Sequence, residues 1–376
     1  MTSPERQPAT IHDVAKVAGV AAGSASRALN NQANVGTALR ERVLMAAQKL
    51  NYKRLRKRTS KSDSKQLPST GSLNIGFICF GMEDAMVNLP VVSTALHGIE
   101  TAVGLKGGTL MIANIPKGDR VPAFLSEGKI SGLILKGPNQ GELPSPSENK
   151  LLEQIYRYPL IWLMGRLDNA IGDHCNFDQE LAGRLAAEHL HVKGHRHIAF
   201  INPKPGHTQF EFVQRAVVDW GQRLGCTVNV FAPNPRPKFV WPLPAMTSPT
   251  IVSELIQRWA QEPRGKRATA FVVGADTTAV QVYRALTCLG IKVGRDVGLV
   301  SCNDERSLVM DLDPPLTTIN VRAELIGKNA VGRLHWRLSH PEDKTPCRLL
   351  IEPVLVERES VPTLTLAGEL LPCPRA

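Results

Sequence analysis

The sequence lacks the features that would place it in a membrane or outside the cell. No apolar run approaches the roughly 18–20 residues that a membrane-spanning helix needs. The first ten residues are polar and contain no hydrophobic signal segment, so we expect a cytoplasmic protein. The seven cysteines are scattered and none forms a Cys-x-x-Cys pair, which favours reduced thiols over a disulfide framework or a zinc site.

The motifs of several large enzyme classes are also missing. The chain has no Gly-x-Gly-x-x-Gly after a predicted strand, no Gly-x-x-x-x-Gly-Lys-Ser/Thr loop, no Gly-x-Ser-x-Gly and no His-Glu-x-x-His. We therefore expect a protein that is not an enzyme and carries no cofactor. A histidine cluster leaves a metal site open as an alternative, but we predict solvated or helix-capping roles for its members, His189, His191, His195 and His197.

The sequence does have an uneven distribution of charge. Its 376 residues carry a net charge of +11, and residues 1–66 hold 13 Lys+Arg against four acidic residues. Those 66 residues thus account for +9, which leaves the other 310 residues near neutral. A small basic segment beside a neutral body is typical of a nucleic-acid-binding module joined to another domain, with a solvated basic tail as the alternative.

The basic segment predicts three short helices. Thr10 and Asp13 form a capping-box pattern at the start of the first helix, and Gly19 is placed to end it. Apolar spacing predicts a second helix over 21–29 and a third over 37–50. Two helices joined by a turn that contains glycine match the helix-turn-helix motif, whose second helix enters the DNA major groove.

These residues resemble a known family. Residues 10–20, Thr-Ile-His-Asp-Val-Ala-Lys-Val-Ala-Gly-Val, and residues 24–30, Ser-Ala-Ser-Arg-Ala-Leu-Asn, are similar to the lactose-repressor (LacI/GalR-type) family of bacterial regulators. The likeness continues without a gap to Tyr52. It implies a transcription repressor that acts as a homodimer on near-palindromic double-stranded DNA and is associated with the nucleoid when bound.

The resemblance assigns DNA contacts residue by residue. Ser26 and Arg27 fall at family positions that contact DNA, and the Arg27 guanidinium suits a bidentate contact to guanine. A phosphate contact or a contact within the helix is the alternative for Arg27. Thr10, Asn30 and Asn34 match positions near the DNA backbone or groove.

The second helix departs from the family pattern at its start. Ala21 replaces the usual capping serine, and Ala22 and Gly23 stand where the family carries large or polar base readers. Losing a cap and placing a glycine inside a helix each cost about 1 kcal/mol. We predict that specificity rests on Arg27, Ser24, close approach of the backbone at Gly23, and DNA shape.

The segment after Tyr52 also departs from the family. The family inserts a leucine of a hinge helix into the minor groove, but Lys61 occupies that position and Leu55 is out of register. We predict a basic arm that follows phosphates instead, formed by Lys53, Arg54, Arg56, Lys57 and Arg58. Residues 60–72, rich in Ser, Lys, Gly and Pro, predict a linker.

The rest of the chain alternates predicted strands and helices. Apolar strands are expected at 73–80, 109–113, 131–135, 160–164, 198–202, 227–231, 269–273 and 297–302. Helical patterns lie between them at 92–105, 122–128, 151–156, 179–192, 211–224, 252–260 and 278–289. This alternation favours parallel sheets covered on both faces, and the length favours two lobes. The resemblance adds that the body is similar to periplasmic sugar-binding proteins.

The predicted fold is therefore an N-terminal all-α helix-turn-helix head followed by an α/β, periplasmic-binding-protein-like body of two doubly wound parallel-sheet lobes. We expect a DNA-binding domain over 1–52, the arm and linker over 53–72, an effector-binding and dimerisation domain over 73–360, and a tail over 361–376. One lobe is expected from 73–177 plus 305–335, and the other from 178–304 plus the C-terminal strand. A solute-binding protein of periplasmic type is the alternative function, but it predicts a signal peptide and no basic head.

A small-molecule effector is expected in the cleft between the lobes, at the carboxyl ends of the strands. Asp276 matches the effector-binding carboxylate of the family, with a helix N-cap as the alternative. Trp241, Arg166 and Asp304 are further candidates, with loop packing, a surface ion pair and a structural role as their alternatives. Other family ligand groups are missing, such as the asparagine replaced by Ala275, so the effector is a sugar or another compound.

Overall fold

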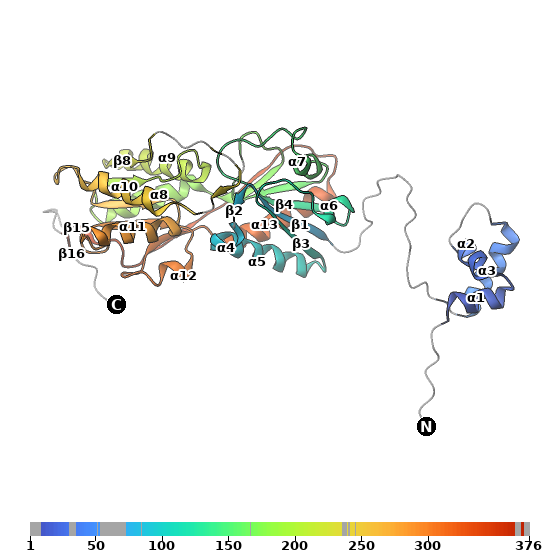
Figure 1. Cartoon of the computed structure of the whole chain (residues 1–376). Coiled ribbons are helices and arrows are strands. Elements are labelled where there is room, and N and C mark those ends of the chain that lie inside the picture. Colours follow the sequence, from blue (N-terminus) through green and yellow to red (C-terminus); the bar gives the residue numbers. More distant parts are fainter. Residues whose placement is uncertain are drawn as a thin grey trace, which may run out of the picture. The chain divides into compact units, whose positions relative to one another are not determined.

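The fold was determined as a computed structural model that describes residues 9–29, 35–50, 52, 73–83, 85–165, 167–234, 239, 241–244, 246–364 and 370–371. The chain divides into two compact units, Met1–Gln66 and Leu67–Ala376, which we call the head and the body (Figure 1). This division falls inside the segment 53–72 that we predict to be arm and linker. The exact ends of the four predicted segments stay predictions.

The head contains the three predicted helices, α1 (Ile11–Ala18), α2 (Ala22–Leu29) and α3 (Thr37–Lys49). The predicted capping box is confirmed, since the Thr10 amide donates to Asp13 Oδ2 (2.8 Å) and the Asp13 amide donates to Thr10 Oγ1 (3.4 Å). Helix α1 ends at Gly19, whose φ of 62° lies in the left-handed region that favours glycine. The fully buried residues between the three helices are all alanine or valine, namely Val14, Ala15, Ala18, Ala25, Ala28, Val43 and Ala46, and the partly buried Leu29, Leu50 and Tyr52 pack against them.

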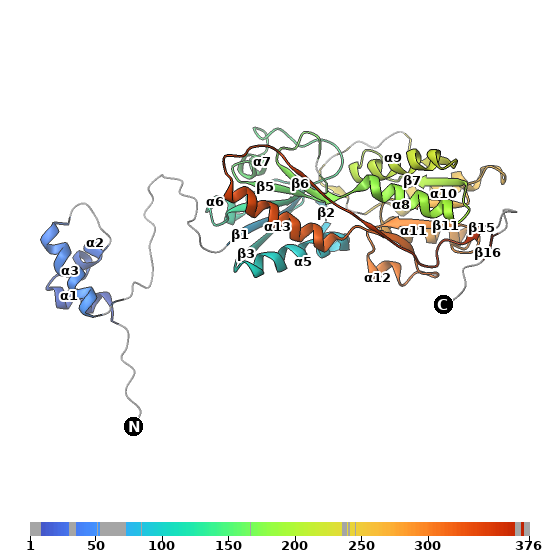
Figure 2. The ribbon, with the colours of Figure 1, turned by 180° about the vertical axis from the view of Figure 1, so that it is seen from behind.

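The first lobe of the body is a six-stranded parallel sheet in the order β13-β6-β5-β4-β1-β3. Its strands are β1 (Asn74–Phe80), β3 (Thr109–Ile115), β4 (Gly132–Lys136), β5 (Leu160–Leu163), β6 (Asp173–Phe177) and β13 (Arg348–Ile351). One face is covered by α5 (Pro90–Leu105) and α13 (Ala323–Ser339), as Figure 2 shows. The other face packs against α6 (Ala123–Ser126) and α7 (Lys150–Ile155).

The second lobe has the same plan, with the sheet order β14-β12-β11-β10-β7-β8. Its strands are β7 (His197–Ile201), β8 (Thr227–Phe231), β10 (Ala270–Val273), β11 (Gly298–Cys302), β12 (Thr317–Asn320) and β14 (Val354–Val356), of which only β14 is antiparallel. Helices α8 (Gln179–Val192) and α9 (Thr208–Arg223) cover one face, and α10 (Pro249–Ala260) and α11 (Asp276–Cys288) cover the other. The predicted fold class is confirmed.

The chain passes between the two lobes three times, after β6, between β12 and α13, and between β13 and β14 (Figure 2). The expected lobe division is therefore wrong for residues 305–320. That segment contains α12 (Arg306–Val309) and β12, and β12 continues the second sheet as the parallel neighbour of β11. Only from α13 onwards does the chain return to the first lobe.

A short strand pair also ties the lobes together. β2 (Met82–Glu83) leaves the first sheet and pairs in parallel with β9 (Leu243–Pro244) of the second lobe. The Leu243 amide donates to the Gly81 carbonyl (2.9 Å) at this junction. This pair links the two lobes just before α4 (Ala85–Asn88) in the chain.

The end of the described chain packs on the second lobe. Val361 is buried, and the Leu364 amide donates to the carbonyl of Lys193 at the end of α8 (2.8 Å). β15 (Thr363–Leu364) pairs with β16 (Leu370–Leu371). Among the described residues, no helix has the length and apolar character needed to cross a membrane.

Candidate DNA-binding helix and interlobe cavity

Helix α2 presents one buried and one open face. Ala25 and Ala28 pack into the head core, whereas Gly23 and Arg27 are exposed and Ser24 is half-buried. The Arg27 Nε donates to the Gly23 carbonyl one turn earlier (3.2 Å), so the guanidinium lies along the open face. This face offers a cation, a hydroxyl and uncovered backbone, which are the groups that contact bases and phosphates in a groove.

The structure describes five of the predicted DNA-binding residues. Gly23, Ser24, Ser26 and Arg27 share α2, and Thr10 is the exposed N-cap of α1. The other predicted positions lie outside the described residues; they are Asn30, Asn34, Lys53, Arg54, Arg56, Lys57 and Arg58. Lys61 and Leu55 of the expected hinge also lie outside the described residues. The DNA contacts of all these residues stay predictions.

A cavity of about 90 Å³ lies between the lobes, lined by residues of both. Its polar lining comes largely from the carboxyl ends of strands, where open α/β sheets bind ligands. Lys136 is the last residue of β4, and Lys204 and His207 follow β7. The volume is well below the roughly 300–1,000 Å³ of drug-sized ligand pockets, so in this conformation the cleft holds only a compact molecule.

Two lysines dominate the electrostatics of the cavity. Lys136 is 3% exposed and its Nζ donates to the Gly137 carbonyl (2.6 Å). Burial lowers the pKa of Lys136 to about 8. Lys204 donates to the Pro244 carbonyl (3.3 Å), and burial together with the charge of Lys136 lowers its pKa to about 8. Burial and both lysines hold the pKa of His207 well below its ordinary value.

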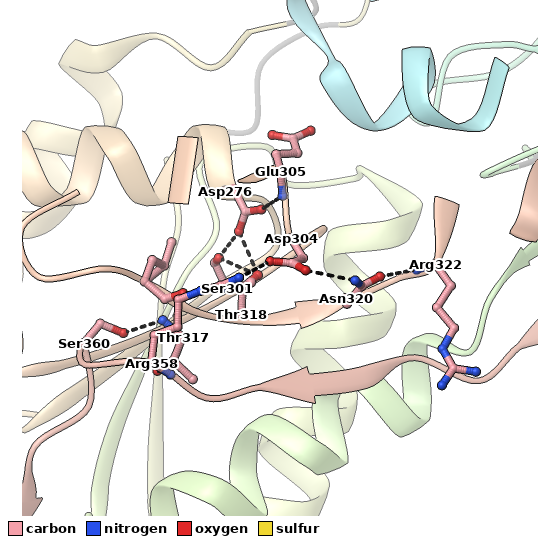
Figure 3. A network of polar contacts seen from close by, with 11 residues as sticks. Asp276, Ser301, Asp304, Glu305, Thr317, Thr318, Asn320, Arg322, Arg358 and Ser360 are labelled. Carbon is pink, nitrogen blue, oxygen red and sulfur yellow. Dashed lines mark hydrogen bonds and ion pairs between the residues drawn. The ribbon is translucent and has the colours of Figure 1, made fainter. Parts of the chain in front are cut away.

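Asp276 lies outside this cavity, in the polar network of Figure 3. Its carboxylate is fully buried and accepts hydrogen bonds from the Ser301 hydroxyl, the Thr318 hydroxyl (2.8 Å) and the Glu305 amide (2.7 Å). Burial raises the pKa of Asp276 to about 6, against the effect of these donors. The N-cap alternative is wrong, because Ala275 occupies the cap position and Asp276 is the first helical residue.

Glu305 extends the network to the first lobe. Its Oε1 accepts from the Val91 amide at the start of α5 (3.0 Å), a contact between the lobes. Burial, followed by the charge of Asp276, raises the pKa of Glu305 to about 7. The Asp276 network therefore holds the lobes against each other, and both carboxylate oxygens of Asp276 are already occupied by protein donors.

The other effector candidates also have protein partners. The Trp241 ring packs edge-on against Phe80 of the first lobe (centroids 5.7 Å apart). Asp304 forms an ion pair with Arg358 (2.6 Å) and accepts from Asn320 Nδ2 (2.9 Å), as Figure 3 shows. Neither residue lines the cavity, and Arg166 lies outside the described residues. These geometries favour the packing and structural alternatives for Trp241 and Asp304, and their effector contacts stay predictions.

The histidine cluster is part of the packing at the end of α8. His195 is fully buried and bonds to the Thr269 hydroxyl (2.9 Å) and to the Pro362 carbonyl (3.0 Å). The expected solvated or capping role is therefore wrong for His195, because the C-terminal segment covers it. Within the described part of the chain, no three His, Cys, Asp or Glu side chains come together as a metal site.

Sequence reasoning missed the polar residues that do line the cavity. They are Lys136, Asn139, Gln140, Lys204, His207, Gln209, Thr247, Thr277 and Asn303. The sequence contains a signal for three of them, Lys136, Lys204 and His207. A lysine that ends the apolar strand 132–136, and a Lys-Pro-Gly-His run after the strand 197–201, mark the strand ends where a ligand is expected.

Comparison with known proteins fits this architecture. The family "Bacterial regulatory proteins, lacI family" matches residues 10–54, and "Periplasmic binding protein-like domain" matches residues 187–361. The chain belongs to the LacI family. It is thus a DNA-binding transcription regulator with an effector-binding type of domain, in a family that is not enzymatic. The basic head that matches the LacI family argues against the solute-binding alternative.

Relatives match this LacI-family chain over nearly all of its length. The "HTH-type transcriptional repressor PurR" of Aliivibrio fischeri is 26% identical over 94% of this chain and 98% of the relative. The "Lactose operon repressor" of Escherichia coli is 26% identical over 87% of this chain and 84% of the relative. Two solved structures share the fold of this chain. One is a CelR–cellobiose complex, with a TM-score of 0.61 and 20% identity, and the other is a Lac repressor dimer bound to operator and the anti-inducer ONPF, with a TM-score of 0.60 and 24% identity. Each aligns with 94% of this chain and 99% of its own.

Proposed function

We propose that this LacI-family protein is a cytoplasmic, nucleoid-associated repressor that binds near-palindromic double-stranded DNA as a homodimer. The open face of α2 carries this proposal, because it presents Arg27 and Ser24 beside bare backbone at Gly23. Two heads related by a twofold axis would place two such helices on two half-sites. A small-molecule effector between the lobes would change operator affinity by coupling the two sites.

The proposed DNA contacts fall into three groups. Arg27, Ser24 and Ser26 contact bases or phosphates from α2, and Gly23 allows its backbone to approach the DNA. Thr10, Asn30 and Asn34 contact the backbone or groove edge. The basic residues at 53–58 add phosphate contacts that make affinity depend on salt.

Exposed apolar side chains on the first lobe support the dimer. Leu105 at the end of α5 is 85% exposed, and Ile112 on the edge strand β3 is 48% exposed. A second copy of the chain would cover both residues. The solved Lac repressor structure is a dimer bound to its operator, and we propose the same kind of assembly for this chain.

The segment boundaries 1–52, 53–72, 73–360 and 361–376 are part of the proposal. So is the effector role of Asp276, Trp241 and Asp304, which we propose to be indirect: they hold the cavity walls in place through the contacts described above. Arg166 stays a candidate from the sequence alone.

Selection of bound DNA from a randomised library tests the proposal. Full-length protein at two salt concentrations is expected to enrich a near-palindromic motif. Arg27→Ala should relax or change the preference at one position in each half-site, since a bidentate arginine–guanine contact discriminates by about 1–3 kcal/mol.

Arg42→Ala provides a matched control, because it removes the same charge from an exposed position on α3. It should lower affinity for all sequences alike and leave the motif unchanged. Salt-sensitive binding without any motif would contradict sequence-specific recognition, and an unchanged motif in Arg27→Ala would contradict the role of that residue.

A further inference from the structure

Lys136 is a buried amine on the wall of the cavity between the lobes. It is the last residue of β4 and is 3% exposed. Its Nζ donates to the Gly137 carbonyl (2.6 Å), and no described carboxylate forms an ion pair with it or lines the cavity. A buried ammonium without a counter-ion is costly, so this position favours the neutral amine.

The neutral form of Lys136 is populated at physiological pH. Burial lowers its pKa to about 8, and Cys79, its partner in register on β1, is a neutral thiol because burial raises the pKa of that thiol to about 11. At pH 7 a lysine with a pKa of about 8 is about one tenth neutral, whereas a lysine with the ordinary pKa of 10.5 is about 0.03% neutral. A neutral lysine amine in an apolar site is a nucleophile that forms imines with carbonyl compounds.

The cavity suits a small carbonyl compound. Its volume is about 90 Å³, and apolar side chains of both lobes, such as Val92, Phe177 and Phe210, form part of its wall. The formation of an imine releases one molecule of water. A site that excludes bulk water protects the imine from hydrolysis.

Two polar groups of the cavity have atoms that lack a partner in the described structure. Asn139 is 7% exposed, and its Oδ1 is an acceptor without a donor. A hydroxyl group of a ligand supplies such a donor. His207 Nδ1 is also unpartnered, and burial, together with the charges of Lys204 and Lys136, holds the pKa of His207 well below its ordinary value. A neutral imidazole in the same cavity can accept a proton and return it.

We propose that Lys136 binds a short hydroxyaldehyde covalently, as an imine, and that this compound is the effector of the regulator. The lone pair of Nζ attacks the aldehyde carbon, and a C=N bond replaces the C=O bond. The two protons of the amine leave with the aldehyde oxygen as water, so the step needs no oxidant or reductant. His207 carries a proton from nitrogen to oxygen, and the ligand hydroxyl donates to Asn139 Oδ1. The inference rests on the proposed function, in which an effector binds between the lobes.

Lys204 is the second amine in the lining, and its pKa is about 8 as well. Lys204 is half-buried, whereas Lys136 is 3% exposed, so water can solvate the Lys204 ammonium more easily. We therefore place the imine on Lys136. The experiment has to locate the adduct residue by residue.

Reductive trapping of the full chain tests the inference, with glycolaldehyde and glyceraldehyde as probes. Cyanoborohydride reduces an imine to a stable amine, which raises the mass of the modified lysine by that of the aldehyde less one oxygen atom. Peptide mapping by mass spectrometry then locates the adduct. With limiting aldehyde at pH 7, Lys136 is expected to be labelled ahead of the exposed lysines. Glycerol, which has the size of glyceraldehyde but no carbonyl group, should neither modify the chain nor change its operator affinity.

The variant Lys136→Met keeps an unbranched side chain and removes the amine. It is expected to lose the adduct in the cavity while the slow labelling of exposed lysines is unchanged, and a native circular dichroism spectrum would show that it is folded. Lys266→Met is the matched control, since Lys266 is exposed in the second lobe and outside the lining. Glyceraldehyde should change the operator affinity of the parent and of Lys266→Met several-fold, and should leave that of Lys136→Met unchanged.

Three outcomes would overturn the inference: Lys136 is labelled no faster than the exposed lysines, the adduct lies on Lys204, or an adduct on Lys136 leaves operator affinity unchanged. All three are measured on the parent, so they do not depend on the folding of a variant. Library selection separates this failure from failure of the proposed function. A palindromic motif without an adduct on Lys136 rejects only the covalent effector, whereas loss of the motif rejects the proposed function itself.

Discussion

The head and the body bury different kinds of side chain. The fully buried core of the head consists of alanine and valine, whereas the largest fully buried side chains of the body are Trp162, Trp259, Phe77, Phe80, Phe200 and Phe271. Hydrophobic stabilisation grows by about 0.8 kcal/mol per buried methylene, so each of these large aromatic side chains contributes far more than an alanine or valine of the head. We therefore expect the head to be less stable than the body and to gain stability from a ligand that binds its folded form, as DNA does.

Replacing Asp173 should produce the largest loss, confined to the body. Its carboxylate is 1% exposed, and it accepts from Arg333 Nε (2.6 Å), Arg337 Nη2 (2.5 Å) and the Cys347 amide (2.9 Å). Asp173→Ala leaves two guanidinium groups without their carboxylate, which costs about 3–5 kcal/mol. Hydrogen exchange should speed up across β6 and α13 and remain unchanged in α1–α3.

Asp311→Ala is the control for this change, because Asp311 is exposed in the second lobe. It should leave exchange in both regions as it was. Faster exchange of the head in Asp173→Ala would show that the two units are not independent.

The free energy of unfolding of the body should also depend on Asp276. Its pKa of about 6 in the folded state exceeds its ordinary 3.8. The folded state therefore keeps a proton between about pH 4 and 6 that the unfolded state has lost, and this contribution to stability disappears as pH rises through the window. One pKa unit corresponds to about 1.4 kcal/mol, so the change is on the order of 3 kcal/mol.

Urea unfolding of the parent and of Asp276→Asn, measured between pH 4 and 7, isolates this contribution. The parent should lose stability relative to the variant as pH rises, because the amide does not titrate. If the free energies of unfolding of the two proteins depended on pH in the same way, the raised pKa of Asp276 would be contradicted. Hydrogen exchange of the head should be the same in both proteins at every pH.

Loss of the two methyl groups of Val43 should be enough to unfold the head. Val43 is fully buried and is one of two valines in a core otherwise made of alanine. Val43→Ala removes two carbons, worth about 2 kcal/mol with the cavity that remains. We expect near-complete loss of protection from hydrogen exchange in α1–α3 and of operator binding, with an unchanged unfolding temperature of the body.

Addition of saturating operator DNA should restore part of the protection, since ligand binding adds to the stability of the folded head. Leu44→Ala is the control, because Leu44 is a neighbour on α3 that is 50% exposed. A head that stays fully protected in Val43→Ala would mean that its stability does not come from this core.

The sequence predicts the fold better than the effector site, and particular residues show why. Helix boundaries follow local signals, such as the Thr10–Asp13 capping box and Gly19, and apolar strands such as 132–136 stand out by composition. The surroundings of Asp276 have no such local signal. Whether a carboxylate after a strand faces a cavity or three protein donors depends on Ser301, Thr318 and Glu305, which are 25 to 42 residues away. Positions fixed by such long-range contacts carry no local pattern.

Gly23→Ala should have the smallest effect, and it distinguishes the stability of the head from its affinity for DNA. Gly23→Ala should stabilise α2 by about 1 kcal/mol, and the new Cβ meets only Arg27 Nη2 at 4.0 Å, an ordinary contact. If the backbone at Gly23 approaches DNA, the same methyl group lowers operator affinity several-fold although the head is more stable. Gly36→Ala adds a methyl group at the N-cap of α3, where nothing lies within 4 Å, and should leave the affinity nearly unchanged. If operator affinity rises together with stability in Gly23→Ala, the stability of the head limits its affinity for DNA. The open face of α2 would then recognise DNA through Arg27 and its hydroxyl groups, without close approach of the backbone.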